Sequence, residues 1–364
     1  MRNKSISFII IFTLCLLCVP AYNYFSEKNS FSKESSESFL NKAYNIDPIL
    51  SLVGGVGNAL GYSIDPRKVI VGKNGWLFLG NAFNNTVTKK ISGNNDKYTL
   101  AIENVKLSVL SWKKYLQEIG CNNFYVIIGP DKDSIYSEFT PNWYKQSSNS
   151  ISAGVIDSTP DVYIDTFAAI RKYKSASQLP LYFKTDTHWN ELGASVAFNA
   201  LAKKSSEAGS SLIWPTEKLV YKKKQRATGD LSNFQRSGIF LNDIDVRIIS
   251  PSITKINITE LSYFKKSLIY KGENIEIESP KEPLIIRSPQ ALNKKRVVWL
   301  RDSFGTAMSR IMAKTFYETL QIHHGKVKPS EIRKIIADYK PDYVIVTVVE
   351  RDSMSTFFNY RPKN

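Results

Sequence analysis

Short, continuous apolar runs constrain the fold of this chain more than any other feature of its sequence. Residues 124–128, 162–164, 296–300 and 343–349 contain such runs, and segments with helical periodicity lie between them. Strands that are buried on both faces have this composition, because helices cover both sides of a parallel sheet. The alternation therefore predicts an α/β fold with a doubly wound parallel sheet in an α/β/α arrangement.

Further elements follow from turn and cap signals. We expect a β-hairpin over residues 69–79, in which Asn74-Gly75 supplies the turn. We expect a helix that ends at Gly120, a strand over residues 181–183, and a helix that Asn190 caps. The remaining expectations are a helix from residue 306, a strand over residues 319–322 and a helix over residues 330–339.

The composition changes after Trp214-Pro215 and becomes lysine-rich and irregular until about residue 290. Stretches such as residues 246–249 and 275–278 alternate between apolar and polar residues, which indicates antiparallel strands. We interpret residues 215–290 as a β-rich insertion within one domain that spans residues 62–364. Residues 22–61 are rich in Ser, Asn, Lys and Glu, and we expect them to form a stalk or linker.

Residues 1–21 have the composition of an export signal. Arg2 and Lys4 precede an uncharged run over residues 5–19, and Pro20-Ala21 offers a small residue for cleavage. The run is short for a transmembrane helix, which needs about 20 apolar residues, although an uncleaved signal-anchor remains open. In either case we expect a periplasmic or other extracytoplasmic protein, soluble or tethered to the inner membrane by this segment.

A tetrapeptide, Asp186-Thr187-His188-Trp189, follows the predicted strand over residues 181–183. In an extended segment, side chains two residues apart point to the same side. Asp186 could therefore lie beside the His188 imidazole and fix its tautomer, as the acid of a Ser-His-Asp triad does. Taken alone, an Asp-x-His sequence is more often a surface or capping pair.

A second polar segment, Arg301-Asp302-Ser303-Phe304, follows the strand over residues 296–300. Functional side chains of open α/β sheets collect at the carboxyl ends of the strands. We therefore predict that Ser303 meets His188 and Asp186 as nucleophile, base and orienting acid, with the Ser303 backbone N–H as an oxyanion donor. Asp302 could instead be a simple helix cap. We expect no metal, because scattered carboxylates around one histidine lack zinc-ligand spacing.

The formal net charge of +16 favours a polyanionic partner such as an acidic polysaccharide or an anionic lipid surface. Nucleic acid is excluded as a partner, since the chain is predicted to be exported and contains no recognisable nucleic-acid-binding module. The excess is equally consistent with a solvated, lysine-rich surface.

Several motifs resemble those of the alginate O-acetyltransferase family of the AlgJ/AlgX type, whose catalytic domain is SGNH-hydrolase-like. The Asp-His pair precedes the serine in this chain, whereas ordinary SGNH esterases place the serine near the start. Arg301 departs from the pattern, because SGNH proteins usually have glycine there. The matching segments lie between about residues 65 and 355 and are residues 71–78, residues 186–190, Gly193-Ala194, Gly229-Asp230-Leu231, residues 301–304 and Glu350-Arg351.

The resemblance implies an SGNH-hydrolase-like fold in which Ser303 is the nucleophile, His188 the base and Asp186 its orienting partner. It implies transfer of acetyl groups to hydroxyls of an exported polysaccharide through a serine ester. It also implies a membrane-bound O-acyltransferase as the acetyl donor and no bound cofactor. Glycan recognition is then expected from the insertion or from the catalytic domain itself.

Other interpretations stay open. An extracytoplasmic carbohydrate acetylesterase would use the same triad with water as acceptor, and a non-catalytic glycan-binding scaffold would need no triad. The adjacent pair His323-His324 is interpreted as ordinary surface histidines. Further candidates for substrate or oxyanion contacts, which could equally form simple ion pairs, are Arg301, Asp302, Glu350 and Arg351.

Overall fold

The computed structural model describes residues 6, 12–13, 17–25, 36–215 and 218–362. Most of the predicted export signal over residues 1–21, including its basic start, and residues 26–35 of the predicted stalk lie outside the described residues. No helix in the described part of the chain combines the length and the apolar character that crossing a membrane requires.

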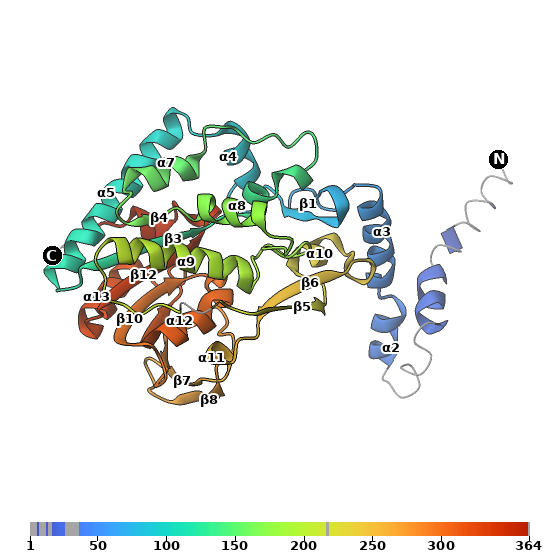
Figure 1. Cartoon of the computed structure of the whole chain (residues 1–364). Helices are drawn as coiled ribbons and strands as arrows, with labels where there is room; N and C mark the ends of the chain where they lie inside the picture. Colours follow the sequence, from blue (N-terminus) through green and yellow to red (C-terminus); the bar gives the residue numbers. More distant parts are fainter. Residues whose placement is uncertain (1–5, 7–11, 14–16, 26–35, 216–217, 363–364) are drawn as a thin grey trace.

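Among the described residues, an eight-stranded mixed sheet forms the centre of the molecule (Figure 1). Five neighbouring strands are parallel to one another, which confirms the predicted α/β fold with a central parallel sheet. In spatial order they are β4 (Tyr163–Ile164), β3 (Asn123–Gly129), β12 (Tyr343–Val349), β10 (Asn293–Arg301) and β11 (Phe316–Ile322).

Helices cover both faces of this sheet, and alternate residues of each strand serve the two faces. In β3, Tyr125 and Ile127 belong to the core on the side of α9, whereas Val126 and Ile128 belong to the core on the side of α5. The continuous apolar runs therefore arise because no strand face is left to solvent. The main helices are α5 (Asp96–Glu118), α7 (Ile151–Ser158) and α13 (Pro329–Tyr339) on one side, with α9 (Glu191–Glu207) and α12 (Ser309–Thr315) on the other.

The remaining elements of the described chain connect these layers. A helix, α8 (Thr166–Ala176), follows β4. Shorter helices and 3₁₀ turns are α4 (Thr86–Ser92), α6 (Lys132–Ile135), α10 (Asp230–Gln235), α11 (Pro251–Thr254), η2 (Lys73–Gly75), η3 (Ser137–Phe139), η4 (Gly238–Phe240), η5 (Ser303–Met308), η6 (Glu350–Asp352) and η7 (Thr356–Asn359).

The β-rich region between residues 215 and 290 contributes directly to the central sheet. Three of its strands continue the sheet beyond β11 in antiparallel pairing. The other two form a separate antiparallel pair, of which β6 packs against α9. The strands are β5 (Tyr221–Arg226), β6 (Asp243–Ile248), β7 (Asn257–Ser262), β8 (Leu268–Glu273) and β9 (Leu284–Arg287).

Several local predictions are confirmed. β1 (Val69–Val71) and β2 (Leu77–Leu79) form the predicted hairpin, with Asn74 and Gly75 both at positive φ in the turn. Asn190 caps α9, because its side chain accepts hydrogen bonds from two amides of the first turn. The helix expected from residue 306 begins earlier, as η5, and continues as α12.

Two predicted strands are wrong. Residues 181–183 form only an isolated bridge between Tyr182 and Trp189. The Phe183 and Lys184 carbonyls accept hydrogen bonds from the Lys132 side chain, and the Lys184 carbonyl also accepts from the Leu77 amide of β2. Residues 275–278 lie outside any strand, since the carbonyls of Ile277 and Glu278 accept hydrogen bonds from the Arg301 guanidinium. In both segments a cationic side chain binds backbone carbonyls.

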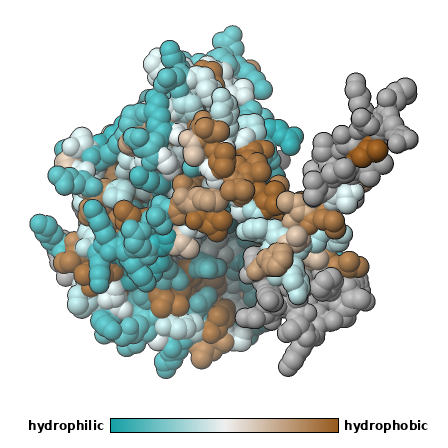
Figure 2. Space-filling model, turned by 90° about the vertical axis from the view of Figure 1, so that its right-hand side faces the viewer, coloured by the Kyte–Doolittle hydropathy of each residue, from teal (hydrophilic) through white to brown (hydrophobic). Residues whose placement is uncertain are grey.

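The segment before the body folds into two helices, α2 (Ser36–Ala43) and α3 (Asp47–Ala59), and α3 packs against α10. The Gln235 side chain donates to the carbonyls of Gly54 at 3.2 Å and Tyr62 at 2.9 Å, and accepts from the Ile64 amide at 3.2 Å. The face turned to the viewer in Figure 2, the side on which α3 lies in Figure 1, carries a broad apolar area. Exposed apolar residues of α3 are Leu52, Val53 and Val56.

Substituting Gly54→Ala should displace α3 from the body. A Cβ there would lie 2.1 Å from the Gln235 carbonyl oxygen, a backbone atom. In an isolated helix the same change from glycine to alanine stabilises the helix by about 1 kcal/mol. A decrease of roughly 1–3 kcal/mol in the free energy of unfolding would therefore identify the packing contact as the cause. Thermal unfolding measures the loss of stability, and limited proteolysis around residues 47–64 measures the displacement of α3. Val53→Ala on the exposed face is the control; an unchanged Gly54→Ala protein would contradict the packing.

Candidate active site

Ser303 is held at the carboxyl end of β10 by the preceding aspartate. Asp302 Oδ1 accepts from the Phe304 amide at 2.9 Å, and Oδ2 accepts from the Val349 amide at 2.7 Å. Burial alone would raise the pKa of Asp302, but His324 and the two amide donors hold it below its usual value. The predicted cap is therefore confirmed, and it also ties the start of η5 to the end of β12.

The interpretation of His323-His324 as surface residues is wrong for His324. This side chain is buried next to Phe357 and Phe358, and its Nε2 lies 3.8 Å from Asp302 Oδ2. His324 follows the end of β11, which lies beside β10, and is thereby close to the Asp302 cap of η5.

A buried lysine holds the loop that carries Asp186 and His188 in place through hydrogen bonds. Lys132 Nζ donates to the carbonyls of Phe183 at 2.9 Å, Lys184 at 2.8 Å and Asp186 at 2.7 Å. Burial lowers the pKa of Lys132 to about 7, although nearby carboxylates favour its charged form. An ammonium group has three donors, and here each has a carbonyl acceptor.

The structure brings Asp186, His188 and Ser303 into one chain of contacts. His188 Nε2 lies 2.8 Å from Ser303 Oγ, and His188 Nδ1 lies 2.7 Å from Asp186 Oδ1. The Asp186 oxygen also accepts from the His188 amide at 3.1 Å. With the proton on Nδ1, the imidazole donates to Asp186 and is free to accept from the Ser303 hydroxyl, which is the hydrogen-bond order of a Ser-His-Asp triad.

Asp186 stays ionised because its surroundings supply donors and positive charge. Burial would raise its pKa, but the hydrogen bonds and charge of His188, with Arg226, hold it well below the usual range. Arg226 Nη2 lies 3.3 Å from Asp186 Oδ2, and its guanidinium lies 4.0 Å above the Phe183 ring. Gly229 packs so closely that an added Cβ would lie 2.3 Å from Asp186 atoms.

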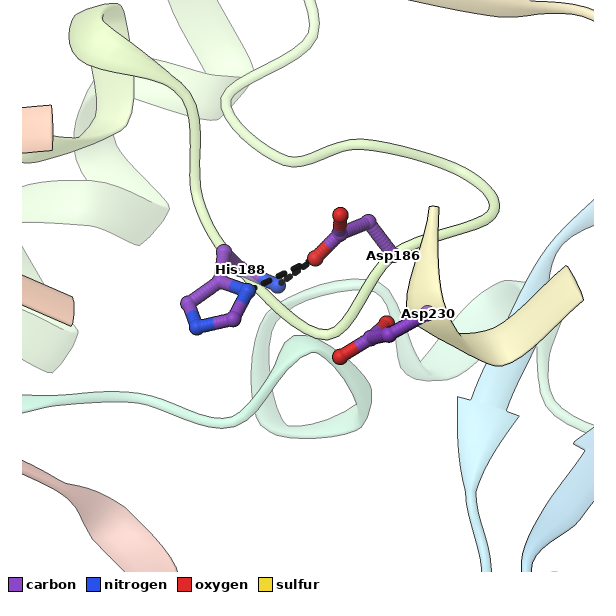
Figure 3. A group of neighbouring side chains, drawn as sticks. All are labelled: Asp186, His188 and Asp230. Atoms are coloured by element: carbon purple, nitrogen blue, oxygen red, sulfur yellow. Dashed lines mark hydrogen bonds and ion pairs between the residues drawn. The ribbon is translucent and has the colours of Figure 1, made fainter. Parts of the chain in front are cut away.

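Asp230 lies on the other side of the same loop (Figure 3). Its donor atoms, with those of Asp186 and His188, lie within 4.8 Å of one another, a spacing that a metal ion could bridge. The same atoms are engaged within the protein, because Asp230 accepts from the Thr187 amide at 2.8 Å and its hydroxyl at 2.7 Å. We therefore interpret the cluster as a hydrogen-bonded support of His188.

The histidine and serine segments are also joined directly. The buried Trp189 indole N–H donates to the Phe304 carbonyl at 2.8 Å. The Phe304 ring lies 5.1 Å from the Trp189 ring and 5.2 Å from the His188 ring. The residue after the base and the residue after the serine thus form one packed unit.

A cavity of about 480 Å³ opens at Ser303 and His188, and this volume is of the size that small-molecule sites have. Its walls come from the base-bearing loop, the start of η5, β5, β6 and the segment after β8. The lining residues are Phe183, Asp186, His188, Trp189, Asn190, Glu191, Arg226, Asp245, Arg247, Glu276, Glu278, Ser279, Ser303, Thr306 and Ala307.

None of the four residues predicted as substrate or oxyanion contacts lines this cavity in the described part of the chain. Arg301 is fully buried, and burial lowers the pKa of its guanidinium to about 9. The guanidinium donates to the carbonyls of residues 277 and 278 at 2.8 and 2.6 Å. Asp302 is the cap described above. Glu350 and Arg351 line a different cavity of about 310 Å³, where Glu350 accepts from the Asp131 amide and Arg351 pairs with the Asp131 carboxylate.

The comparisons with known proteins bear on part of this region. Residues 69–244 match the family model described as the SGNH hydrolase-like domain of acetyltransferase AlgX. The match contains Asp186, His188 and Asp230 and ends before Ser303. It confirms the resemblance to the AlgJ/AlgX-type family over this segment. No curated protein sequence matches the chain.

Solved structures extend the likeness of the fold over more of the chain. PatB1 of Bacillus cereus superposes with a TM-score of 0.57 at 14% identity, over 81% of this chain and 99% of PatB1. A DHHW family protein of Eubacterium siraeum gives a TM-score of 0.54 at 15% identity, over 82% of this chain and 100% of that protein. At such identities these likenesses concern the fold.

Gly229→Ala should impair the site while leaving the fold intact. Gly229 has extended φ and ψ of −99° and −163°, which alanine also adopts, so the nearest obstacle to a Cβ is the space that Asp186 occupies. Displacing Asp186 by about 1 Å should lower the rate of ester cleavage about 100-fold. Hydrolysis of p-nitrophenyl acetate measures this.

Gly154→Ala is the matched control, because its Cβ would meet only the ends of the Ile102 and Asn94 side chains, far from the cavity. Circular dichroism and thermal unfolding should be alike for the two variants. Equal activity of both variants would contradict the role given to the contact between Gly229 and Asp186.

Proposed function

We propose that this chain, whose residues 69–244 match the SGNH hydrolase-like domain of acetyltransferase AlgX, is an O-acetyltransferase that modifies an exported polysaccharide. The contact chain Asp186–His188–Ser303 at the mouth of a cavity carries the proposal. One of the similar structures is PatB1 with a sulfonyl adduct. Sulfonyl reagents modify activated nucleophiles, so Ser303 is the position at which we expect such a reagent to react here.

In the first half-reaction, Ser303 Oγ attacks the carbonyl carbon of an acetyl donor while its proton passes to His188 Nε2. The tetrahedral intermediate then collapses, the leaving group takes that proton, and the acetyl group remains on Ser303 as an ester. Asp186 stabilises the imidazolium that forms between these steps. A backbone amide at the developing oxyanion contributes about 3 kcal/mol, and the Ser303 N–H is the candidate donor.

In the second half-reaction, a sugar hydroxyl enters the cavity and gives its proton to His188 Nε2. Its oxygen attacks the acetyl carbonyl carbon, the bond to Ser303 Oγ breaks, and the serine regains the proton from His188. The products are an O-acetyl sugar and the free enzyme. No cofactor takes part in either step.

The proposal includes export of the protein and a partner that supplies acetyl groups. Cytosolic acetyl-CoA does not reach an extracytoplasmic site, so a membrane-bound O-acyltransferase is the proposed source. The charged start of the chain and the uncharged run over residues 5–19 support export, either as a cleaved signal or as an inner-membrane tether.

Hydrolysis is the second candidate function, and the exposure of the base favours it. The His188 side chain is 28% exposed, so water can approach it as a sugar hydroxyl would. A carbohydrate acetylesterase would then use the same three residues, with water as the acceptor. A glycan-binding scaffold would use none of them.

Ser303→Ala should abolish ester cleavage, and Asp186→Asn should lower its rate roughly 10⁴-fold because the wrong imidazole tautomer is then favoured. Hydrolysis of p-nitrophenyl acetate gives the rates, and mass spectrometry after phenylmethylsulfonyl fluoride treatment shows whether the adduct is lost in Ser303→Ala. Ser175→Ala on the exposed side of α8 is the control. Full activity of Ser303→Ala would show that another residue is the nucleophile, and no ester cleavage by the unaltered protein would support the scaffold.

The purified protein, given p-nitrophenyl acetate and an oligosaccharide, should form O-acetylated sugar detectable by mass spectrometry. A transferase diverts acetyl from water to sugar, so the ratio of acetyl sugar to free acetate should rise with sugar concentration. Free acetate alone, at every sugar concentration and with Ser303 intact, would assign the site to an esterase.

A further inference from the structure

The cavity at Ser303 is acidic, in contrast to the chain as a whole. Five carboxylate side chains line it, against two guanidinium groups, and no lysine is among its lining residues in the described chain. The formal net charge of the chain is +16. The lysine excess lies elsewhere, for example on the exposed positions Lys222, Lys223 and Lys224 of β5. The global charge is therefore a poor guide to what enters the cavity.

Both guanidinium groups of the lining are already neutralised. Arg226 pairs with Asp186 at 3.3 Å. Arg247 pairs with Asp245 and, at 3.2 Å, with Glu276. An incoming carboxylate would have to displace a carboxylate that the protein itself supplies, and one of these orients the catalytic base.

The other carboxylates differ in how far they are compensated. Glu191 is buried and held by Arg310, whose Nε donates to it at 2.6 Å. Burial raises the pKa of Glu276 to about 7, and the nearby charge of Glu191 adds to this. Glu278 has an exposed side chain, and no ion pair or hydrogen bond joins its carboxylate to another described residue.

The cavity thus offers uncompensated negative charge and no uncompensated positive charge. Like charges in a partly buried site repel more strongly than in water, and specificity often rests on such repulsion. The ionisation of Glu276 depends on its neighbours, because a nearby cation favours its charged form and a nearby anion opposes it.

We propose that the acceptor subsite at Ser303 takes sugars without a carboxylate, with an amine-bearing sugar preferred over a neutral one and a uronic acid excluded. This inference rests on the proposed function for the identity of the site as an acceptor site. Glu278 and Glu276 are its specificity-determining residues, and Glu278 is the carboxylate that an ammonium or hydroxyl group of the sugar would meet.

Binding separates this inference from the transfer reaction. The Ser303→Ala protein, shown to be folded by circular dichroism, is titrated by calorimetry with three tetrasaccharides at equal ionic strength: a glucosamine, a glucose and a galacturonate oligomer. The expected order of affinity is glucosamine, then glucose, with galacturonate at least tenfold weaker than glucose. Galacturonate binding as tight as glucose, or no binding of any of the three, would overturn the proposal.

Charge removal tests the two glutamates. In the Ser303→Ala background, Glu278→Gln should reduce the ratio of glucosamine to galacturonate affinity about tenfold, and Glu276→Gln should reduce it further when combined. Glu282→Gln, on the same segment but outside the cavity, should leave the ratio unchanged. An equal ratio in the Glu278→Gln and Glu282→Gln proteins would remove Glu278 from the site.

Failure of the proposed function has a different signature. If the active protein never acetylates a sugar yet binds the glucosamine and glucose oligomers as expected, the site is an esterase with the proposed selectivity. If it acetylates the galacturonate oligomer as fast as the glucose oligomer, it is a transferase and the selectivity is wrong.

Discussion

A hydrogen bond between the Trp189 indole and the Phe304 carbonyl joins two segments that lie 115 residues apart in the chain. The rings of the same two residues pack together, and His188 lies against Phe304. A histidine and a serine on separate loops need such a link, because the position of each side chain otherwise depends on its own loop alone. Here the neighbour of each is fixed to the neighbour of the other, so the 2.8 Å contact between His188 and Ser303 follows from the packing of the core.

Much of the fold could be predicted from local signals. The apolar runs that became β3, β10 and β12, and the cap at Asn190, depend on short-range pattern and burial, which the sequence displays. The prediction failed where a tertiary partner decides the backbone. Residues 181–183 looked like a strand, but Lys132 takes up the carbonyls of the loop that follows them, and nothing in the local pattern indicates this.

The site shows the same division. Asp186, His188 and Ser303 could be proposed because their residue types and positions after apolar runs carry the chemistry. Arg226 and Lys132 could not, since their contacts with the base-bearing loop arise only from the folded chain. Gly229-Asp230 was noted as part of a motif, yet its role as a support for Asp186 and Thr187 became visible only from the packing. For a related reason the net charge of the chain is a poor guide to the charge of the cavity, because it also counts the surfaces outside the cavity.

The short helix α10 carries at each end a residue that binds another segment of the chain. Asp230 at its start holds Thr187 beside the base, and Gln235 at its end grips the backbone of α3 and of the turn after it. The six residues of α10 therefore connect the backbone of α3 to the loop that carries the imidazole. Displacing α3 from α10 would therefore also disturb the support of the proton-transfer group.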